Sequence, residues 1–194
     1  MTVMPGLNAP DKDQIISTIE AYLAQTTLED LSIANVAKDL NVSPRYIFKR
    51  FRTKLEMADA VAARHVATLA DLINTQTACG RPGEKLETLL RILTGSMARM
   101  EPTRSAALAI AASRERRALV VFKNQLVSRI EEILVEGQRW QEFKPFDPKI
   151  TALTIFDLLA AIADPRVIEA LPAAELRLKS ERIISFIIAS VANA

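Results

Sequence analysis

Hydrophobic residues recur at helical spacing along most of the chain, and the first such segment spans about residues 12–25. Ile15 and Ile19 lie four positions apart there and share one face of the expected helix. Asp11 and Asp13 stand at the start of the segment, where carboxylates suit the positive end of a helix dipole. The pattern predicts a helix here, and similar segments downstream predict an all-α protein.

Two short helices with a tight turn between them are expected next. Ser32 is a suitable N-cap for the first of them. Asn41 tolerates the left-handed backbone of a tight helix end, and Ser43 with Pro44 supplies the N-cap and first residue of the second helix. Two such helices form a helix-turn-helix, predicted at about residues 32–51, whose second helix enters the major groove of DNA.

Helical periodicity continues to the end of the chain. Thr53 and Glu56 have the spacing of a capping box, which predicts a long helix that ends near Thr77. Further helices are expected at about residues 84–100, 103–112, 115–138, 148–163 and 173–192. The prediction is about nine helices in two domains, a three-helix domain with the helix-turn-helix in residues 1–54 and a helical bundle in residues 55–194.

Positive charge is concentrated on the second short helix. The whole chain has a net charge of +2, yet the segment 43–55 contains no acidic residue beside Arg45, Lys49, Arg50, Arg52 and Lys54. At about 100° per residue, Ile47 and Phe51 point inward, and three of these basic residues, Arg45, Lys49 and Arg52, cluster on the opposite face beside Tyr46. Such a face suits phosphate contacts and base readout. The alternative is an ordinary amphipathic helix with a solvated face.

Composition limits the other functions. Hydrophobic residues make up 49% of the chain and aromatic residues 5%, as is typical of packed helices. Cys79 and His65 are the only cysteine and histidine, so neither a metal site nor a cofactor is expected. No apolar run reaches the roughly 20 residues of a membrane helix, and no signal peptide is recognisable, so we expect a cytoplasmic protein with no membrane partner.

Two other classes of protein remain as alternatives. An enzyme is disfavoured because the chain has no glycine-rich phosphate loop and nothing that pairs a nucleophile with a base. A helical ligand-binding or adaptor protein without DNA binding would not need five positive charges around one short helix.

The segment "LSIANVAKDLNVSPRYIFKRFRTKLEMADAV", residues 31–61, resembles the TetR family of bacterial transcriptional regulators. The likeness consists of a hydroxyl cap, an Ile/Val-Ala pair, a turn that ends in Val-Ser, an aromatic-x-x-Phe pattern and a Lys at the start of the next helix. The later segment "EFKPFDP" also resembles the family. The AraC type of helix-turn-helix is an alternative, because Ser-Pro-Arg-Tyr is frequent in it. That type usually carries two such motifs, whereas this chain has one.

The resemblance implies a ligand-responsive regulator, most often a repressor, that binds double-stranded DNA at a palindromic operator as a homodimer and is released by a small molecule. It implies that Ser32 caps its helix at the phosphate backbone, that Arg45 and Tyr46 read bases, and that Lys49, Arg50 and Lys54 hold phosphates. The full predicted DNA-binding set is Ser32, Ser43, Pro44, Arg45, Tyr46, Lys49, Arg50, Arg52 and Lys54.

The chain departs from the family pattern at three positions. Asn41 stands where the family usually has the glycine of the turn, and Arg45 also stands where glycine is frequent. Phe48 stands where a tyrosine that bonds phosphate is common. The operator of a relative therefore cannot be transferred to this chain.

The resemblance also implies that residues 55–194 bind an effector and form the dimer. The last two expected helices are apolar over more than one stripe, so one face can fill the core while another meets a partner. The predicted interface residues are Ile155, Phe156, Leu159, Ile183, Phe186 and Ile187. A monomer with both helices buried on all sides is the alternative. A largely apolar effector is expected, and the candidate contacts, each of which could equally be ordinary packing, are His65, Met97, Met100 and Phe122.

Overall fold

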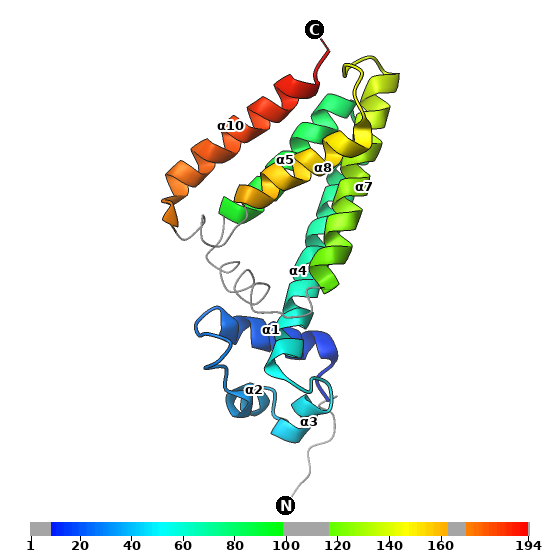
Figure 1. The fold of residues 1–194 in the computed structure, drawn as a ribbon. Helices are drawn as coiled ribbons and strands as arrows, with labels where there is room; N and C mark the ends of the chain where they lie inside the picture. Colours follow the sequence, from blue (N-terminus) through cyan, green and yellow to red (C-terminus); the bar gives the residue numbers. More distant parts are fainter. Residues whose placement is uncertain (1–8, 99–116, 163–169, 194) are drawn as a thin grey trace, which may run out of the picture.

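The computed structural model describes residues 9–98, 117–162 and 170–193, which form eight α-helices (Figure 1). They are α1 (Lys12–Leu23), α2 (Ile33–Asp39), α3 (Pro44–Phe48), α4 (Lys54–Gln76), α5 (Pro82–Ala98), α7 (Arg117–Arg139), α8 (Pro148–Ile162) and α10 (Ala173–Val191). The all-α prediction is confirmed, and the helix bounds agree closely with the periodicity. The helix expected at residues 103–112 lies outside the described residues.

The helices are arranged in two lobes joined by α4 (Figure 1). The lower lobe contains α1, α2 and α3, and the upper lobe contains α5, α7, α8 and α10. Each lobe has its own hydrophobic cluster, and α4 contributes Met57 and Val61 to the lower one and Ile73 to the upper one. The expected domain boundary after residue 54 therefore falls at the first turn of a helix that belongs to both lobes.

Side-chain caps set the helix starts in the lower lobe. The carboxylate of Asp11 accepts a bond from Gln14 N at 2.7 Å, and Gln14 returns it by accepting from Asp11 N at 3.0 Å. Thr53 caps α4 by accepting from Glu56 N at 3.1 Å. The predicted capping box is wrong in its second bond, because Glu56 reaches one residue further back and accepts from Arg52 N at 2.6 Å.

The upper lobe is closed at the corner between α7 and α8. Gly137 lets the ring of Phe143 lie directly against the α7 backbone, and its carbonyl accepts from Phe143 N at 3.2 Å. The end of α10 packs there as well, because Asn193 N donates to Glu142 O at 2.8 Å. The corner thus holds the end of α10 against the segment between α7 and α8.

We expect Gly137→Ala to lower the free energy of unfolding by about 1–3 kcal/mol, because the new Cβ would lie 2.0 Å from Cδ2 of the buried Phe143 ring. Gly83→Ala is the matched control, since its Cβ would meet only the Glu142 carboxylate, at 3.3 Å. Thermal or urea unfolding of both variants checks this. Equal stability of the two variants would contradict the packing of the corner.

Candidate nucleic-acid interface

The turn between α2 and α3 has the geometry that its sequence predicts. Ser32 Oγ accepts from Asn35 N, and Ser43 Oγ accepts from Tyr46 N, each at 3.3 Å. Asn41 adopts a φ of 53°, the left-handed region that Asn tolerates better than most residues. This conformation explains how Asn can stand in place of the expected glycine. The caps and the turn together fix the direction in which α3 leaves α2.

The inner face of α3 is anchored in the lower hydrophobic cluster. Ile47 has an exposed fraction of 0%, and Phe51 is buried just after the helix. Both pack with residues of α1, α2 and α4 in this cluster. The short helix of five residues is therefore held by tertiary packing, because so few backbone bonds could not hold it alone.

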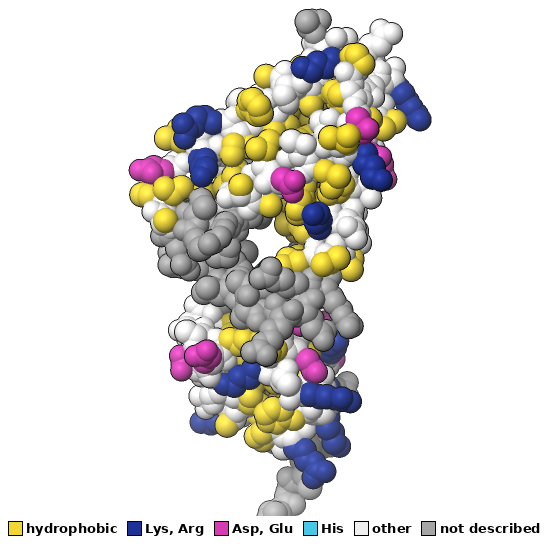
Figure 2. All heavy atoms as spheres, in the orientation of Figure 1, with side chains coloured by type: hydrophobic (Ala, Val, Ile, Leu, Met, Phe, Trp, Pro, Cys, Tyr) yellow, Lys and Arg dark blue, Asp and Glu magenta, His cyan; other side chains and the backbone are white. Residues whose placement is uncertain are grey.

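Exposed basic residues lie on and just after α3: Arg45 is in the helix, Lys49 is its C-cap, and Arg52 follows it. The side chains of Arg45, Lys49 and Arg52 make no hydrogen bond or ion pair within the part of the chain that the structure describes. Figure 2 shows Lys and Arg side chains gathered at this end of the lower lobe. On α2, Asp39 accepts from the Tyr22 hydroxyl at 2.6 Å, a bond that raises the pKa of Tyr22. Within the described residues, no carboxylate forms an ion pair with any of the three cations.

Three further predicted DNA contacts have protein partners of their own. The Tyr46 hydroxyl donates to Pro10 O at 2.9 Å, and the Arg50 guanidinium stacks 3.7 Å from the centroid of the Tyr46 ring. Lys54 Nζ donates to Glu29 O at 2.5 Å. Arg50 and Lys54 are each held by an uncharged group, so these contacts position their charges without neutralising them.

The structure adds one basic residue that the sequence reasoning missed. Lys12 lies at the start of α1, and its ammonium stands 5.8 Å from the centroid of the Phe51 ring, which brings it to the end of α3. The Asp11 cap predicts where α1 starts, but it cannot predict that Lys12, at this start, lies beside Phe51, because that contact depends on the fold.

His65 lies at the contact between α1 and α4. Its Nε2 is 2.5 Å from Glu20 Oε1, and the Arg64 guanidinium bonds the other oxygen of the same carboxylate. Arg64 also donates to Ser17 Oγ at 2.7 Å. Burial, and then the charge of Arg64, lower the pKa of His65, which suits a neutral imidazole that donates its Nε2 hydrogen to Glu20. This position satisfies the histidine within the protein.

The other effector candidates are only partly visible. Phe122 is partly buried against the upper cluster. The side chain of Met97 and the whole of Met100 lie outside the described residues. Within the described residues no three His, Cys, Asp or Glu side chains form a metal site, and no helix is long and apolar enough to span a membrane.

The predicted interface residues divide between core and surface. Ile155, Leu159 and Ile187 are buried in the chain's own upper cluster, and Phe156 and Ile183 are partly buried against it. Phe186 has an exposed fraction of 65%. The other large apolar side chains exposed on α8 and α10 are Ile150, Leu153 and Leu178. Hydrophobic side chains are accordingly visible along the upper lobe in Figure 2.

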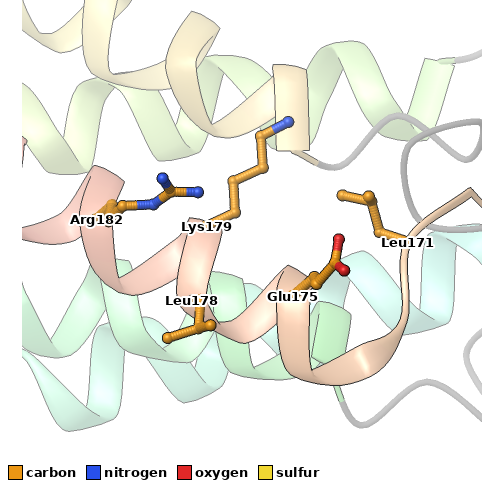
Figure 3. A pocket seen from close by; sticks show the side chains of 5 residues that line it. All are labelled: Leu171, Glu175, Leu178, Lys179 and Arg182. Atoms are coloured by element: carbon orange, nitrogen blue, oxygen red, sulfur yellow. The ribbon is translucent and has the colours of Figure 1, made fainter.

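Two open pockets lie on the upper lobe. One, of about 380 Å³, is lined by Leu171, Glu175, Leu178, Lys179 and Arg182 at the start of α10 (Figure 3). Lys179 extends toward the neighbouring helix there, and Leu178 points the other way. The second pocket, of about 410 Å³, is lined by Asn74, Asn124, Gln125, Ser128, Arg129 and Glu132. Neither is an enclosed apolar cavity.

Comparison with known proteins identifies the family. The sequence model of one protein family, the tetracyclin repressor-like C-terminal domain, matches residues 83–184, which is more than half of the chain. The chain belongs to the TetR family. This match decides against the AraC-type alternative, and the TetR-family assignment from residues 31–61 is confirmed from a different part of the chain.

Solved structures agree with the TetR fold. A transcriptional regulator from Cytophaga hutchinsonii has a TM-score of 0.78 at 13% identity, with 93% of this chain and 98% of that chain covered. The regulator FadR from Bacillus subtilis, in complex with stearoyl-CoA, has a TM-score of 0.74 at 16% identity, with 93% and 99% covered. A TetR/AcrR-family regulator from Thermobifida fusca has a TM-score of 0.73 at 20% identity, with 91% and 95% covered. No curated protein sequence matches the chain.

The lowered pKa of His65 gives the TetR-family chain an expected pH dependence. Well above pH 6.5 the imidazole is neutral in the folded and the unfolded chain, and as the pH falls toward 6.5 the unfolded chain binds the proton first. The free energy of unfolding should therefore fall as the pH drops through 6.5 toward the lower pKa of the folded chain. His65→Gln keeps a donor for Glu20 and should flatten this slope in urea titrations. Because the chain has one histidine, an unchanged slope would contradict the assignment.

Proposed function

We propose that this TetR-family protein is a transcriptional repressor that acts in the cytoplasm by placing α3 in the major groove of an operator. The observation that carries the proposal is the exposed basic surface on and just after α3, where Arg45, Lys49 and Arg52 have no hydrogen-bond or ion-pair partner among the described residues. Arg64, Lys85 and Arg91 form ion pairs with carboxylates, whereas Arg177 and Lys179 on α10 form none within the described residues. The α3 region differs from both because the segment 43–55 has five basic residues and no acidic one. A surface that leaves its cations unpaired suits a polyanionic partner.

Within this interface, position along α3 assigns the roles. Arg45 lies near the start of the helix, where side chains of a recognition helix contact base edges, and a guanidinium can bond O6 and N7 of guanine together. Lys49, the C-cap of α3, and Arg52, which follows the helix, are proposed to hold phosphates, as is Lys12, whose ammonium lies over the Phe51 ring. Ser32, Ser43 and Pro44 keep their proposed place at the DNA backbone, where caps orient the two helices.

A palindromic operator requires two copies of α3, so a homodimer belongs to the proposal. The large apolar residues left exposed on α8 and α10, which are Ile150, Leu153, Leu178 and Phe186, support a two-fold contact through these helices. Half-site centres are then expected about 34–36 Å apart or at a multiple of that distance.

A small-molecule effector completes the proposed mechanism. FadR from Bacillus subtilis, which shares this fold, was solved with stearoyl-CoA. We propose that a largely apolar molecule binds the upper lobe of this chain, with Phe122, Met97 and Met100 as candidate contacts. Linkage requires that the molecule bind the DNA-free and the DNA-bound protein with different affinities. Since α4 is part of both lobes, a change in the upper lobe can reach α3 through it.

Arg45→Ala should weaken binding to the preferred duplex by about 1–3 kcal/mol per half-site and relax the preference at one base pair. Lys49→Ala should weaken all duplexes alike and reduce the salt slope by roughly one unit per lost contact. A binding selection with random duplexes, followed by salt titrations, measures both effects. The base-reading role is excluded if Arg45→Ala keeps the wild-type affinity and preference.

Phe186→Asp should shift the protein from dimer to monomer in sedimentation experiments, because it places a charge in the proposed contact and should weaken it by several kcal/mol. Its folded state should persist, since the side chain is exposed in the single chain. Arg177→Asp, which changes an exposed cation on the same helix, is the control. A wild-type protein that stays monomeric at tens of micromolar would contradict the dimer.

A further inference from the structure

Tyr46 on α3 and Arg50, in the turn after α3, form a bonded pair. Arg50 Nη2 donates to the Tyr46 hydroxyl at 2.5 Å, and its guanidinium carbon lies 3.7 Å from the centroid of the Tyr46 ring. Arg50 Nη1 also approaches Tyr46 O, at 3.4 Å. A guanidinium has five N–H donors, so these bonds leave several of them for another acceptor. Arg50 is exposed, and within the described residues it forms no ion pair with a carboxylate.

The Tyr46 hydroxyl is itself fixed from the other side. It donates its single hydrogen to Pro10 O at 2.9 Å, across 36 positions of sequence. Pro10 directly precedes Asp11, the N-cap of α1, so the hydroxyl links the start of α1 to α3. Because the hydrogen points toward Pro10, a lone pair of the oxygen faces Arg50. The Tyr46 ring is also half-buried against the lower cluster.

These bonds leave Tyr46 little capacity to read a base. Its only donor is used by Pro10, and its ring face is covered by the Arg50 guanidinium. Arg50, by contrast, is held without being neutralised, because both a ring and a hydroxyl are uncharged partners. An arginine side chain has a large rotamer entropy, and a partner that orders it before binding reduces the cost of ordering it on the ligand.

We infer that Tyr46 is a positioning residue that acts through Arg50: it holds the Arg50 guanidinium in place for one DNA phosphate and does not read sequence. This inference rests on the proposed DNA-binding function, and it changes the role that the sequence resemblance implied for Tyr46. The phosphate contact is the same for every sequence, so the effect of Tyr46 on affinity is independent of the bases.

A double-mutant cycle on the full-length protein tests this. The variants are Tyr46→Phe, which keeps the ring and removes the hydroxyl, Arg50→Ala, and the two combined. Each is titrated with the selected duplex and with a scrambled duplex at several salt concentrations. Tyr22→Phe is the matched control, because it removes the hydroxyl of the chain's other tyrosine, which bonds Asp39 and makes no bond to Arg50.

We expect Tyr46→Phe to weaken both duplexes by the same factor, about fivefold per half-site, as for the loss of one hydrogen bond. Arg50→Ala should reduce the salt slope by about one unit per half-site. In the Arg50→Ala background, Tyr46→Phe should have no further effect on affinity, because the group through which it acts is absent. Tyr22→Phe should leave both affinities unchanged.

Three results would overturn the inference. A changed base preference in Tyr46→Phe, with or without Arg50, would make Tyr46 a base reader. If the affinity losses of Tyr46→Phe and Arg50→Ala simply add, Tyr46 acts only structurally, through its bond to Pro10. The melting temperature of Tyr46→Phe would then fall together with its affinity. If the wild-type protein binds no duplex with preference, the proposed function fails together with the inference, whereas preferred binding with an additive cycle removes only the inference.

Discussion

The structure depends on α4 being one continuous helix built into two hydrophobic cores. Met57 and Val61 belong to the lower core and Ile73 to the upper one, so neither lobe can move far without carrying the helix. Polar bonds also hold α4 to both lobes. Glu20 of α1 bonds Arg64 and His65 in the middle of α4, and Arg129 of α7 donates to Thr77 O, just after α4, at 2.7 Å. A rigid element shared by two packed cores can transmit a small displacement, because packed cores do not deform continuously.

The basic side chains differ in their partners. Lys85, Arg91 and Arg64 are paired with carboxylates, so their charges serve the fold. Around α3 several cations lie close together in the sequence, and within the described residues they are either unpaired or held by a ring or a carbonyl, as Arg50 and Lys54 are. Coulombic repulsion among these unpaired cations costs some stability in the free protein. Such a cost is consistent with a surface adapted to an anionic partner.

Local sequence signals predicted most of the fold. Caps at Ser32 and Ser43 and the left-handed turn at Asn41 depend on neighbouring residues, and all are present in the structure. The contacts that the sequence could not predict are distant ones. Tyr46 meets Pro10 across 36 positions and His65 meets Glu20 across 45, so no periodicity or cap could indicate either bond. These bonds change the assigned roles of single residues while leaving the fold unchanged.

The apolar helices show a second limit of sequence patterns. When a helix such as α8 is apolar on several stripes, periodicity cannot say which stripe faces the core of its own chain. The structure resolves this: Ile155 and Leu159 face inward, whereas Ile150 has an exposed fraction of 63%. Exposed apolar side chains of this size are costly in a lone soluble chain when they form one patch, and such patches mark contact surfaces. The same helices therefore complete the core of one chain and also carry exposed apolar side chains, on which the proposed two-fold contact rests.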